Sequence, residues 1–350
     1  MISGLNLTTD ERLIEKLSQF RTVIMPDFFI DRIVKLPSLS DFLKNIEIKR
    51  DAGGGSIHSI EQVEMRGGNA ANVAYGLGRL GVRVNLIAVA NKSSEALLRH
   101  VFSTLPNVSI NTVDGRPGYT VALEFPHQDR LVNVMLSDVG EVGDFTSDKM
   151  PMDCWEKIRK ANLVGVFNWA ANKKGSELAE RVFQEASEND VMTYFAPADV
   201  SGRRSEIPKM LSALQGRLDV LSINENEARI ISEMLSIDRL PIDYRSNHIA
   251  RCVELISDAI GTRVDMHTPF GSASSYEGVT YYSPSFEAER RISTGAGDVW
   301  DSANITGHLL QLDPPERLRL ANAAAALYIS SLDAESPSPT SILSLLEKSV

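Results

Sequence analysis

The chain is poor in cysteine and has no long apolar run. Its 350 residues include two cysteines, Cys154 and Cys252, which lie far apart and belong to no Cys-x-x-Cys pair. The sequence therefore predicts neither a disulfide framework nor a zinc site, and we expect buried thiols in a reducing compartment. Apolar stretches such as 84–90 end well before the roughly 20 residues that cross a bilayer, so no membrane span is expected.

An excess of positive charge is also missing. The formal net charge is −10 and the pI is near 5.2, which argues against nucleic acid or anionic lipid as the main partner, because both need a dense basic surface. The first residues contain no cationic segment followed by an apolar run, so we expect no signal peptide. These observations together predict a soluble, cytoplasmic protein.

The order of apolar and polar segments predicts an α/β fold. With 43% hydrophobic residues, the chain has enough apolar side chains for a large core. After residue 150, helical segments (155–161, 176–189, 209–214, 246–260) alternate with buried strands (163–167, 191–195, 219–223, 263–266), which indicates parallel βαβ units. Two helices, 294–310 and 315–331, follow. We predict one domain over 1–350, in which segments near 32–64 and 108–137, including a hairpin at 119–136, form a smaller sheet.

One glycine motif in the sequence has a misleading pattern. Gly76, Gly78 and Gly81 satisfy G-x-G-x-x-G, but a dinucleotide site needs those glycines after a strand and before a helix. Here they end a helix and precede a strand. We therefore expect Gly76 and Gly78 to allow close helix packing and Gly81 to cap the helix. The chain has no P-loop sequence either.

A second glycine-rich segment, 293–298, opens a helix and points to an anion site. The first N–H groups of a helix have no partner within it and direct partial positive charge at one place. Gly295 and Gly297 have no side chains to block a phosphoryl group, and Asp298 follows at once. A carboxylate there can accept a proton from an attacking hydroxyl, as in a kinase. The alternative is that Asp298 is an ordinary acidic residue of a first helical turn.

Two segments together resemble the signature motifs of a known family. Residues 67–74, Gly-Gly-Asn-Ala-Ala-Asn-Val-Ala, and residues 294–298, Thr-Gly-Ala-Gly-Asp, are similar to the two motifs of the ribokinase-like (PfkB) carbohydrate kinases and occur in the same order. The resemblance covers about residues 21 to 331. It implies a ribokinase-like kinase that uses ATP and Mg²⁺, with a central mostly parallel sheet, helices on both faces and a small β lid over the substrate.

The resemblance also assigns roles to individual residues. Asp298 is similar to the catalytic base, and the amides of Gly295, Ala296 and Gly297 are similar to the anion hole. Asn224 and Glu227 resemble the Asn-x-x-Glu motif, in which Glu227 is linked to Mg²⁺. That link fits the preference of a hard cation for oxygen ligands, although Asn224 in a purely structural role would cap a helix.

On the acceptor side, the family places a carboxylate that binds sugar hydroxyls just after the first strand. Asp31 is the preferred sugar-binding residue and Asp27 is a second candidate; either is alternatively a turn residue. The residues expected beside them are Gly68, Asn69, Asn72 and Asn168. Trp169 either lines the same site or belongs to the core.

The nucleotide side is inferred from the resemblance alone. His267 and Gly271 delimit a turn that the family places near the ATP phosphates and base, although 267–271 departs from the commoner Thr-x-Gly-x-x-Gly. Thr294 is expected at the phosphates and Asn322 at the edge of the adenine. A lone histidine such as His267 is alternatively structural.

The sequence leaves three functional hypotheses open. The first is an ATP- and Mg²⁺-dependent kinase of a small sugar, sugar acid or polyol, with Asp298 as the base. The second is a nucleoside kinase of the same fold, with an acceptor pocket built from Phe28, Phe29 and Trp169. The third is a sugar- or nucleotide-binding regulator without turnover. The resemblance further suggests a homodimer formed through the edges of the lid.

Overall fold

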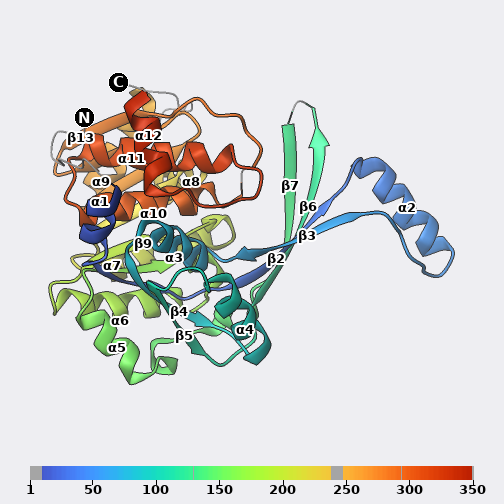
Figure 1. Cartoon of the computed structure of the whole chain (residues 1–350), viewed down its shortest axis with the longest axis horizontal. Coiled ribbons are helices and arrows are strands. Elements are labelled where there is room, and N and C mark those ends of the chain that lie inside the picture. The colour runs from blue at the N-terminus through green and yellow to red at the C-terminus, as the bar shows by residue number, and fades with distance from the viewer. Residues whose placement is uncertain (1–9, 129, 238–246, 293, 349–350) are drawn as a thin grey trace.

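Two β-sheets organise the molecule (Figure 1). The structure is a computed structural model that describes residues 10–128, 130–237, 247–292 and 294–348. Nine strands form the large sheet in the order β13-β12-β11-β10-β9-β8-β1-β4-β5, and four form the small sheet in the order β3-β2-β6-β7. The large sheet contains β1 (Arg21–Met25), β4 (Arg83–Val89), β5 (Val108–Val113), β8 (Leu163–Phe167), β9 (Met192–Ala196), β10 (Val220–Asn224), β11 (Arg263–Thr268), β12 (Gly271–Tyr276) and β13 (Val279–Pro284). The small sheet contains β2 (Phe29–Lys35), β3 (Glu61–Gly67), β6 (Gly118–His127) and β7 (Arg130–Asp138).

Helices cover both faces of the large sheet, which is parallel from β5 to β11 and antiparallel from β11 to β13. Along β1, Val23 and Met25 belong to one apolar cluster and Ile24 to the other, as expected for a strand that is buried on both sides. The described helices are α1 (Asp10–Leu17), α2 (Leu39–Asp51), α3 (Asn69–Leu80), α4 (Lys92–Val101), α5 (Met152–Arg159), α6 (Gly175–Ser187), α7 (Ile207–Leu214), α8 (Glu225–Met234), α9 (Asn247–Ile260), α10 (Ala296–Leu309), α11 (Pro314–Ile329) and α12 (Pro339–Lys348).

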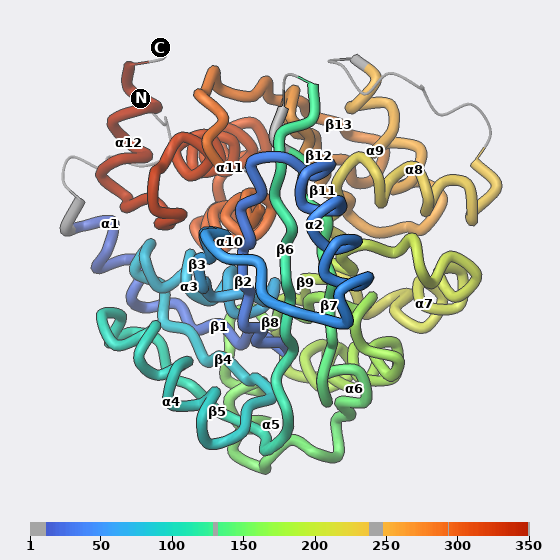
Figure 2. Tube along the Cα trace, turned by 90° about the vertical axis from the view of Figure 1, so that its right-hand side faces the viewer, coloured from blue at the N-terminus to red at the C-terminus, as the bar shows by residue number. Residues whose placement is uncertain are grey.

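The small sheet extends away from the helical body, and α2 lies at its outer end (Figures 1 and 2). In the large sheet, the chain runs from β1 to β4 and β5 on one side and then returns to β8, β9, β10 and β11 on the other. The strand order therefore reverses between β1 and β8. Ligands of open α/β sheets bind at such a reversal, at the carboxyl ends of the strands.

Several predicted elements are confirmed. The predicted hairpin is present, because β6 and β7 pair antiparallel. Gly81 ends α3 in the left-handed conformation, with φ +97°. A Cβ atom at Gly76 would lie 2.4 Å from Oγ of Ser302, so this glycine does permit close helix packing. Both cysteines are buried and free, and none of the helices within the described ranges is long and apolar enough to cross a bilayer.

Two parts of the predicted small sheet are wrong. Residues 108–113 form β5, which pairs in parallel with β4 at the edge of the large sheet. An edge strand is only partly buried, so its pattern resembles that of a lid strand. Within 32–64, residues 39–51 form a helix rather than extended structure. Its first turn is capped by Ser38, whose side chain accepts a hydrogen bond from N of Asp41.

Candidate active site

The site begins where the strand order reverses. Asp27 follows β1 and Asn168 follows β8, and Nδ2 of Asn168 donates to Oδ2 of Asp27 at 2.8 Å. The backbone N–H groups of Asn69 and Ala70 also donate to this carboxylate, at 3.0 and 2.8 Å. Asp27 is completely buried, and burial raises its pKa although these hydrogen bonds oppose the rise. Its two oxygens therefore cap the N-terminus of α3, where Gly68 turns the chain with φ +91°.

Asp298 lies in the first turn of α10 and faces the first turn of α3. Nδ2 of Asn69 donates to its Oδ1 at 2.7 Å, and Nδ2 of Asn72 donates to its Oδ2 at 2.8 Å. The structure thus brings Asp298 together with two residues that lie more than two hundred positions before it in the sequence. Each carboxylate oxygen keeps a lone pair that can accept a hydrogen bond from a substrate hydroxyl.

Two opposing effects act on the charge of Asp298. The side chain is only 7% exposed, and burial raises its pKa to about 8. The amides of Asn72 and Asn69 stabilise the ionised form, whereas the nearby carboxylates Asp301 and Asp27 disfavour it. Two amide donors are the hydrogen-bond partners expected for an ionised carboxylate, but burial has the larger effect on the pKa. A base whose pKa lies near the working pH is well suited to proton transfer.

The turn before α10 offers a surface of backbone amides. Gly295 caps the helix in the left-handed conformation, with φ +87°, and the first backbone hydrogen bond within the helix runs from N of Val299 to O of Gly295. The N–H groups of Ala296, Gly297 and Asp298 therefore have no partner within the helix. This arrangement favours an anion beside Asp298.

Asp31 lies on β2, in the small sheet, and faces Gly67. A Cβ atom at Gly67 would lie 2.2 Å from Cγ of Asp31, so the glycine makes room for the carboxylate. Oδ1 of Asp31 is buried and has no hydrogen-bond partner among the described residues. Burial raises the pKa of Asp31 to about 6, and Asp27 contributes to the rise while a hydrogen bond from Thr120 opposes it. An unpartnered carboxylate oxygen is available to accept from a ligand hydroxyl.

Asn224 and Glu227 form a reciprocal cap at the start of α8. The side chain of Asn224 accepts from the N–H groups of Asn226 and Glu227, while N and Nδ2 of Asn224 donate to the Glu227 carboxylate at 2.9 and 2.8 Å. The structural role that the sequence left open is therefore realised. Burial raises the pKa of Glu227 to about 8, so a cation beside it would stabilise the charged form.

The residues at this end of the sheet fit a Mg²⁺ ion that takes most of its oxygen ligands from water and substrate phosphates. Within the described residues, no group of three or more His, Cys, Asp or Glu side chains could hold a metal ion. Mg²⁺ usually keeps several waters and binds one or two carboxylates together with substrate phosphates. Each oxygen of Glu227 accepts a hydrogen bond from Asn224 and retains a further lone pair, so a single carboxylate of this kind fits that coordination.

His267 connects the Asn224–Glu227 end to the glycine turn. It is the register partner of Asn224 in β10 and β11. A Cβ atom at Gly297 would lie 3.0 Å from Cε1 of His267, and the imidazole lies 5.1 Å from the Trp300 ring. Burial lowers the pKa of His267 to about 4, so the ring is neutral at pH 7. His267 therefore forms a neutral wall beside the amides of the turn.

The other residues predicted on the nucleotide side are Thr294, Asn322 and Gly271, each of which contacts other parts of the protein. Oγ1 of Thr294 accepts from Nδ2 of Asn133 in β7, which joins the small sheet to the glycine turn. Nδ2 of Asn322 donates to O of Ser283 and O of Pro284, and Oδ1 accepts from Nε1 of Trp300. Both amide protons of Asn322 are thus used within the protein, and its contact with adenine stays a prediction. Gly271 begins β12, and a Cβ atom there would lie 2.5 Å from the same Ser283 carbonyl.

Trp169 belongs to the core and not to a ligand wall. Its side chain is completely buried, Nε1 donates to Oγ of Ser176, and the Arg203 guanidinium lies 3.9 Å from the ring centroid. The acceptor pocket of Phe28, Phe29 and Trp169 that the nucleoside hypothesis requires is therefore not observed. Phe28 and Phe29 are also buried.

Arg66 is a site residue that the sequence analysis missed. It directly precedes the glycine pair, at the end of β3, and its Nε donates to Oδ1 of Asn72 at 2.9 Å. Its guanidinium carbon lies 3.8 Å from the centroid of the Tyr75 ring. The signal available in the sequence is its position next to Gly67, but no spacing rule links it to Asp298.

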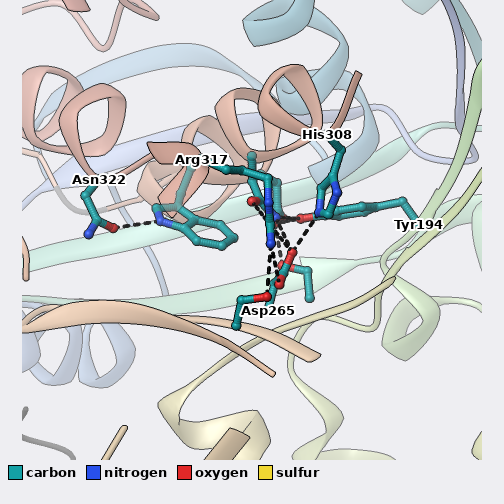
Figure 3. Close-up of polar contacts among 10 residues, drawn as sticks. Tyr194, Asp265, His308, Arg317 and Asn322 are labelled. Carbon is teal, nitrogen blue, oxygen red and sulfur yellow. Dashed lines mark hydrogen bonds and ion pairs between the residues drawn. The ribbon is translucent and has the colours of Figure 1, made fainter. Parts of the chain in front are cut away.

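A buried polar network fixes α10 behind the site (Figure 3). Oδ2 of Asp265, in β11, accepts from Nε2 of His308 at 2.9 Å and from the guanidinium of Arg317 in α11. The hydroxyl of Tyr194, in β9, donates to Asp301 at 2.7 Å. Burial acts to raise the pKa of Asp265, but Arg317 and His308 outweigh it and hold the pKa well below its usual range. Asp301 and His308 lie seven residues apart on one face of α10, so the network holds that helix in place.

Comparison with known proteins decides the family. The sequence model described as pfkB family carbohydrate kinase matches residues 36–341. The chain belongs to the pfkB family of carbohydrate kinases. This pfkB-family kinase is accordingly a phosphotransferase that acts on a sugar hydroxyl.

Individual relatives are distant but cover most of the chain. 5-Dehydro-2-deoxygluconokinase 1 of Bacillus cereus is 26% identical over 294 residues, which cover 78% of this chain and 82% of the relative. The structure of Arabidopsis thaliana ribokinase complexed with ribose and ATP aligns with a TM-score of 0.72 and 20% identity, over 94% of this chain and 98% of that one. Adenosine kinase from Sinorhizobium meliloti aligns with a TM-score of 0.70 and 17% identity, over 95% and 99%. The predicted ribokinase-like α/β fold is confirmed.

Proposed function

We propose that this pfkB-family kinase transfers the γ-phosphoryl group of ATP to a hydroxyl of a small sugar, sugar acid or polyol, with Mg²⁺ as cofactor and Asp298 as the base. The observation that carries the proposal is the position of Asp298. Its carboxylate lies in the first turn of α10, beside three backbone N–H groups that have no partner within the helix, and is held by amides from α3. Base and anion site thus share one helix terminus.

The proposed step requires a proton acceptor and a site for negative charge. The acceptor hydroxyl gives its proton to Asp298 while its oxygen forms a bond to the γ-phosphorus, and the bond from that phosphorus to the leaving oxygen of ADP breaks. The amides of Ala296 and Gly297 donate to the oxygens of the transferred group. These amides belong to a buried helix, so they need little rearrangement during the reaction.

Residues of the small sheet and of the first turn of α3 would bind the acceptor. Asp31 offers a buried oxygen without a described partner, and Asn69 and Asn72 offer amides next to the base. Asp27 and Asn168 fix the start of α3 below them. At the other end of the site, Glu227 would hold Mg²⁺, which neutralises charge on the phosphates when it is bound.

The substrate class follows from the relatives and from the geometry. The Bacillus cereus relative is named for a sugar acid, and the Arabidopsis structure contains ribose and ATP. The nucleoside hypothesis loses support because Trp169 is a core residue. Small polyhydroxy compounds, with or without a carboxylate, are therefore the first acceptors to test.

The test measures ADP release with Mg²⁺ and ATP over a panel that includes ribose, 5-dehydro-2-deoxygluconate, polyols and nucleosides. We expect acceptor-dependent ADP with a sugar or sugar acid, and a loss of kcat of roughly 10²- to 10⁴-fold in Asp298→Asn with little change in nucleotide affinity. The control is Asp153→Asn, an exposed aspartate in the first turn of α5. Activity confined to nucleosides would displace the sugar proposal. A complete lack of acceptor-dependent ADP would favour a regulator.

The proposal includes a homodimer formed through the small sheet. Large apolar side chains are exposed on β6 and β7: Tyr119 (42%), Val134 (44%), Met135 (50%) and Leu136 (57%). Apolar side chains on an accessible sheet favour association with another chain. Light scattering should give twice the chain mass, and Leu136→Lys should shift the protein to monomer. A monomeric parent protein would contradict this part of the proposal.

A further inference from the structure

Two consecutive hydrogen bonds connect Arg66 in the small sheet, through Asn72, to Asp298. Nε of Arg66 donates to Oδ1 of Asn72 at 2.9 Å, and Nδ2 of the same amide donates to Oδ2 of Asp298 at 2.8 Å. We propose that Arg66 is a positioning residue for the reaction, which orients the Asn72 amide and favours the ionised form of Asp298. This inference rests on the proposed role of Asp298 as the base.

The hydrogen bond from Arg66 determines which end of the Asn72 side-chain amide faces Asp298. A primary amide can face a carboxylate with its NH₂ group, which attracts it, or after a flip with its oxygen, which repels it. Because Arg66 has only donors, its bond to Oδ1 leaves the NH₂ group of Asn72 pointing at Asp298. The neighbouring Asn69 differs, since none of the described residues donates to its Oδ1. One of the two amides at the base is therefore fixed by a cation and the other is not.

Arg66 is itself held in place and keeps its charge. Its guanidinium carbon lies 3.8 Å from the Tyr75 ring centroid, and the Tyr75 hydroxyl donates to Oε2 of Glu335 at 2.9 Å. Throughout the described part of the chain, no carboxylate lies within 4 Å of the guanidinium nitrogens. The charge of Arg66 therefore acts on its surroundings without a direct ion-pair partner.

The other charged groups around Asp298 disfavour its ionised form. Asp27 faces it from the end of β1, Asp301 from its own helix, and the neutral hydroxyl of Tyr328 from α11. Both carboxylates disfavour a second negative charge. Arg66 acts in the opposite direction: burial lowers the pKa of its guanidinium, and the interaction with Asp298 is one of the effects that oppose this lowering. His267, on the far side of the turn, is neutral.

The experiment compares pH profiles of kcat/KM for Arg66→Met, Arg66→Lys and the control Arg79→Met. Arg79 lies on α3 and donates to O of Ser336, but it has no bond to Asn72. In Arg66→Met, loss of the charge and of the oriented amide should move the acid limb upward by about one pH unit. Activity should fall roughly tenfold near pH 7 and recover above the shifted limb. Arg66→Lys, which keeps a charged donor, should restore most of the profile, and Arg79→Met should keep the parent profile.

A purely structural role of Arg66 predicts a different result, a loss that is equal at every pH. That outcome, or an unchanged acid limb in a folded Arg66→Met protein, would overturn the inference. If Arg66→Met does not fold, Arg66→Gln provides the same comparison with a neutral donor. The Asp298→Asn variant keeps the two proposals apart. Normal turnover in that variant would show that Asp298 is not the base. An inactive Asp298→Asn protein, together with an unshifted pH profile of Arg66→Met, would contradict only the proposed role of Arg66.

Discussion

Removal of the carboxylate at residue 298 should change how the stability of the protein depends on pH. Burial raises the pKa of Asp298 to about 8 in the folded chain, whereas an unfolded aspartate has a pKa of about 3.9. Between these two values the folded protein holds a proton that the unfolded chain releases. The stabilising contribution is complete below about pH 4 and is lost as the pH rises toward 8. Asp298→Asn has no such titration.

The size of the effect follows from the difference between the two pKa values. Within the window, each pH unit lowers the free energy of unfolding of the parent protein, relative to the variant, by at most about 1.4 kcal/mol. From pH 5 to pH 7 the ceiling is therefore about 2.7 kcal/mol. Titration of nearby Asp301 is coupled to that of Asp298 and spreads the transition over a wider pH range, so we expect about 1 to 2 kcal/mol.

The assay is urea unfolding at pH 5, 6 and 7, with the difference between parent and variant plotted against pH. The variant carries a constant penalty, because its NH₂ group faces the amide of Asn69 or Asn72, but a constant penalty does not alter the slope. Asp153→Asn is the control, since that aspartate is exposed and pairs with Lys157, and it should give a flat difference in this window. Parallel stability curves for the parent and Asp298→Asn would refute the reasoning.

Three further predictions concern α10 and the buried network that holds it. The kcat/KM of the parent protein should rise with pH and level off above about pH 8, the pKa of Asp298 in the free protein. Gly297→Ala should reduce kcat/KM about tenfold, roughly 1.4 kcal/mol, because it places a Cβ atom 3.0 Å from Cε1 of His267 and crowds the anion site. Arg317→Met should lower the free energy of unfolding by about 3 to 5 kcal/mol, because it leaves the buried carboxylate of Asp265 without its cation.

Each of these has a matched control and an opposing result. A flat kcat/KM between pH 6 and pH 9 would contradict the role of Asp298 as a base with a pKa of about 8. Gly202→Ala should leave kinetics unchanged, since a Cβ atom there meets nothing within 4 Å. Arg159→Met breaks a pair with Glu185 in which the arginine is 39% exposed, and should cost at most about 1 kcal/mol. Equal losses of stability in Arg159→Met and Arg317→Met would contradict the argument from burial.

The parts of the site that the sequence predicted are those carried by local backbone geometry. A glycine turn followed by a helix predicts unpaired N–H groups wherever it occurs, and the turn at 295–297 has that form in the structure. The cap at Asn224 and Glu227 is equally local, because its partners lie three residues apart. In both cases the residues that act together are neighbours along the chain.

The parts that the sequence did not predict depend on contacts between distant elements. Strand β5 is only partly buried because it lies at the edge of the large sheet, and a partly buried strand has the same pattern in either sheet. Helix α2 was missed for a different reason: Leu39, Phe42, Leu43 and Ile46 do have helical spacing, but no residue among positions 39–51 is buried against another element. Arg66 approaches Asp298 only through Asn72, and no spacing in the sequence describes that path.

The misleading glycine motif has a role in building the site. A Cβ atom at Gly76 would lie 2.4 Å from Oγ of Ser302, so α3 and α10 approach so closely there that no side chain fits between them. Gly76 lies one turn beyond Asn72 on α3, and Ser302 lies one turn beyond Asp298 on α10. The contact therefore fixes the separation of the two helices just behind their first turns. Hydrogen bonds of 2.7 and 2.8 Å between short side chains require such a separation, so a glycine that binds no nucleotide sets the distance over which the base is held.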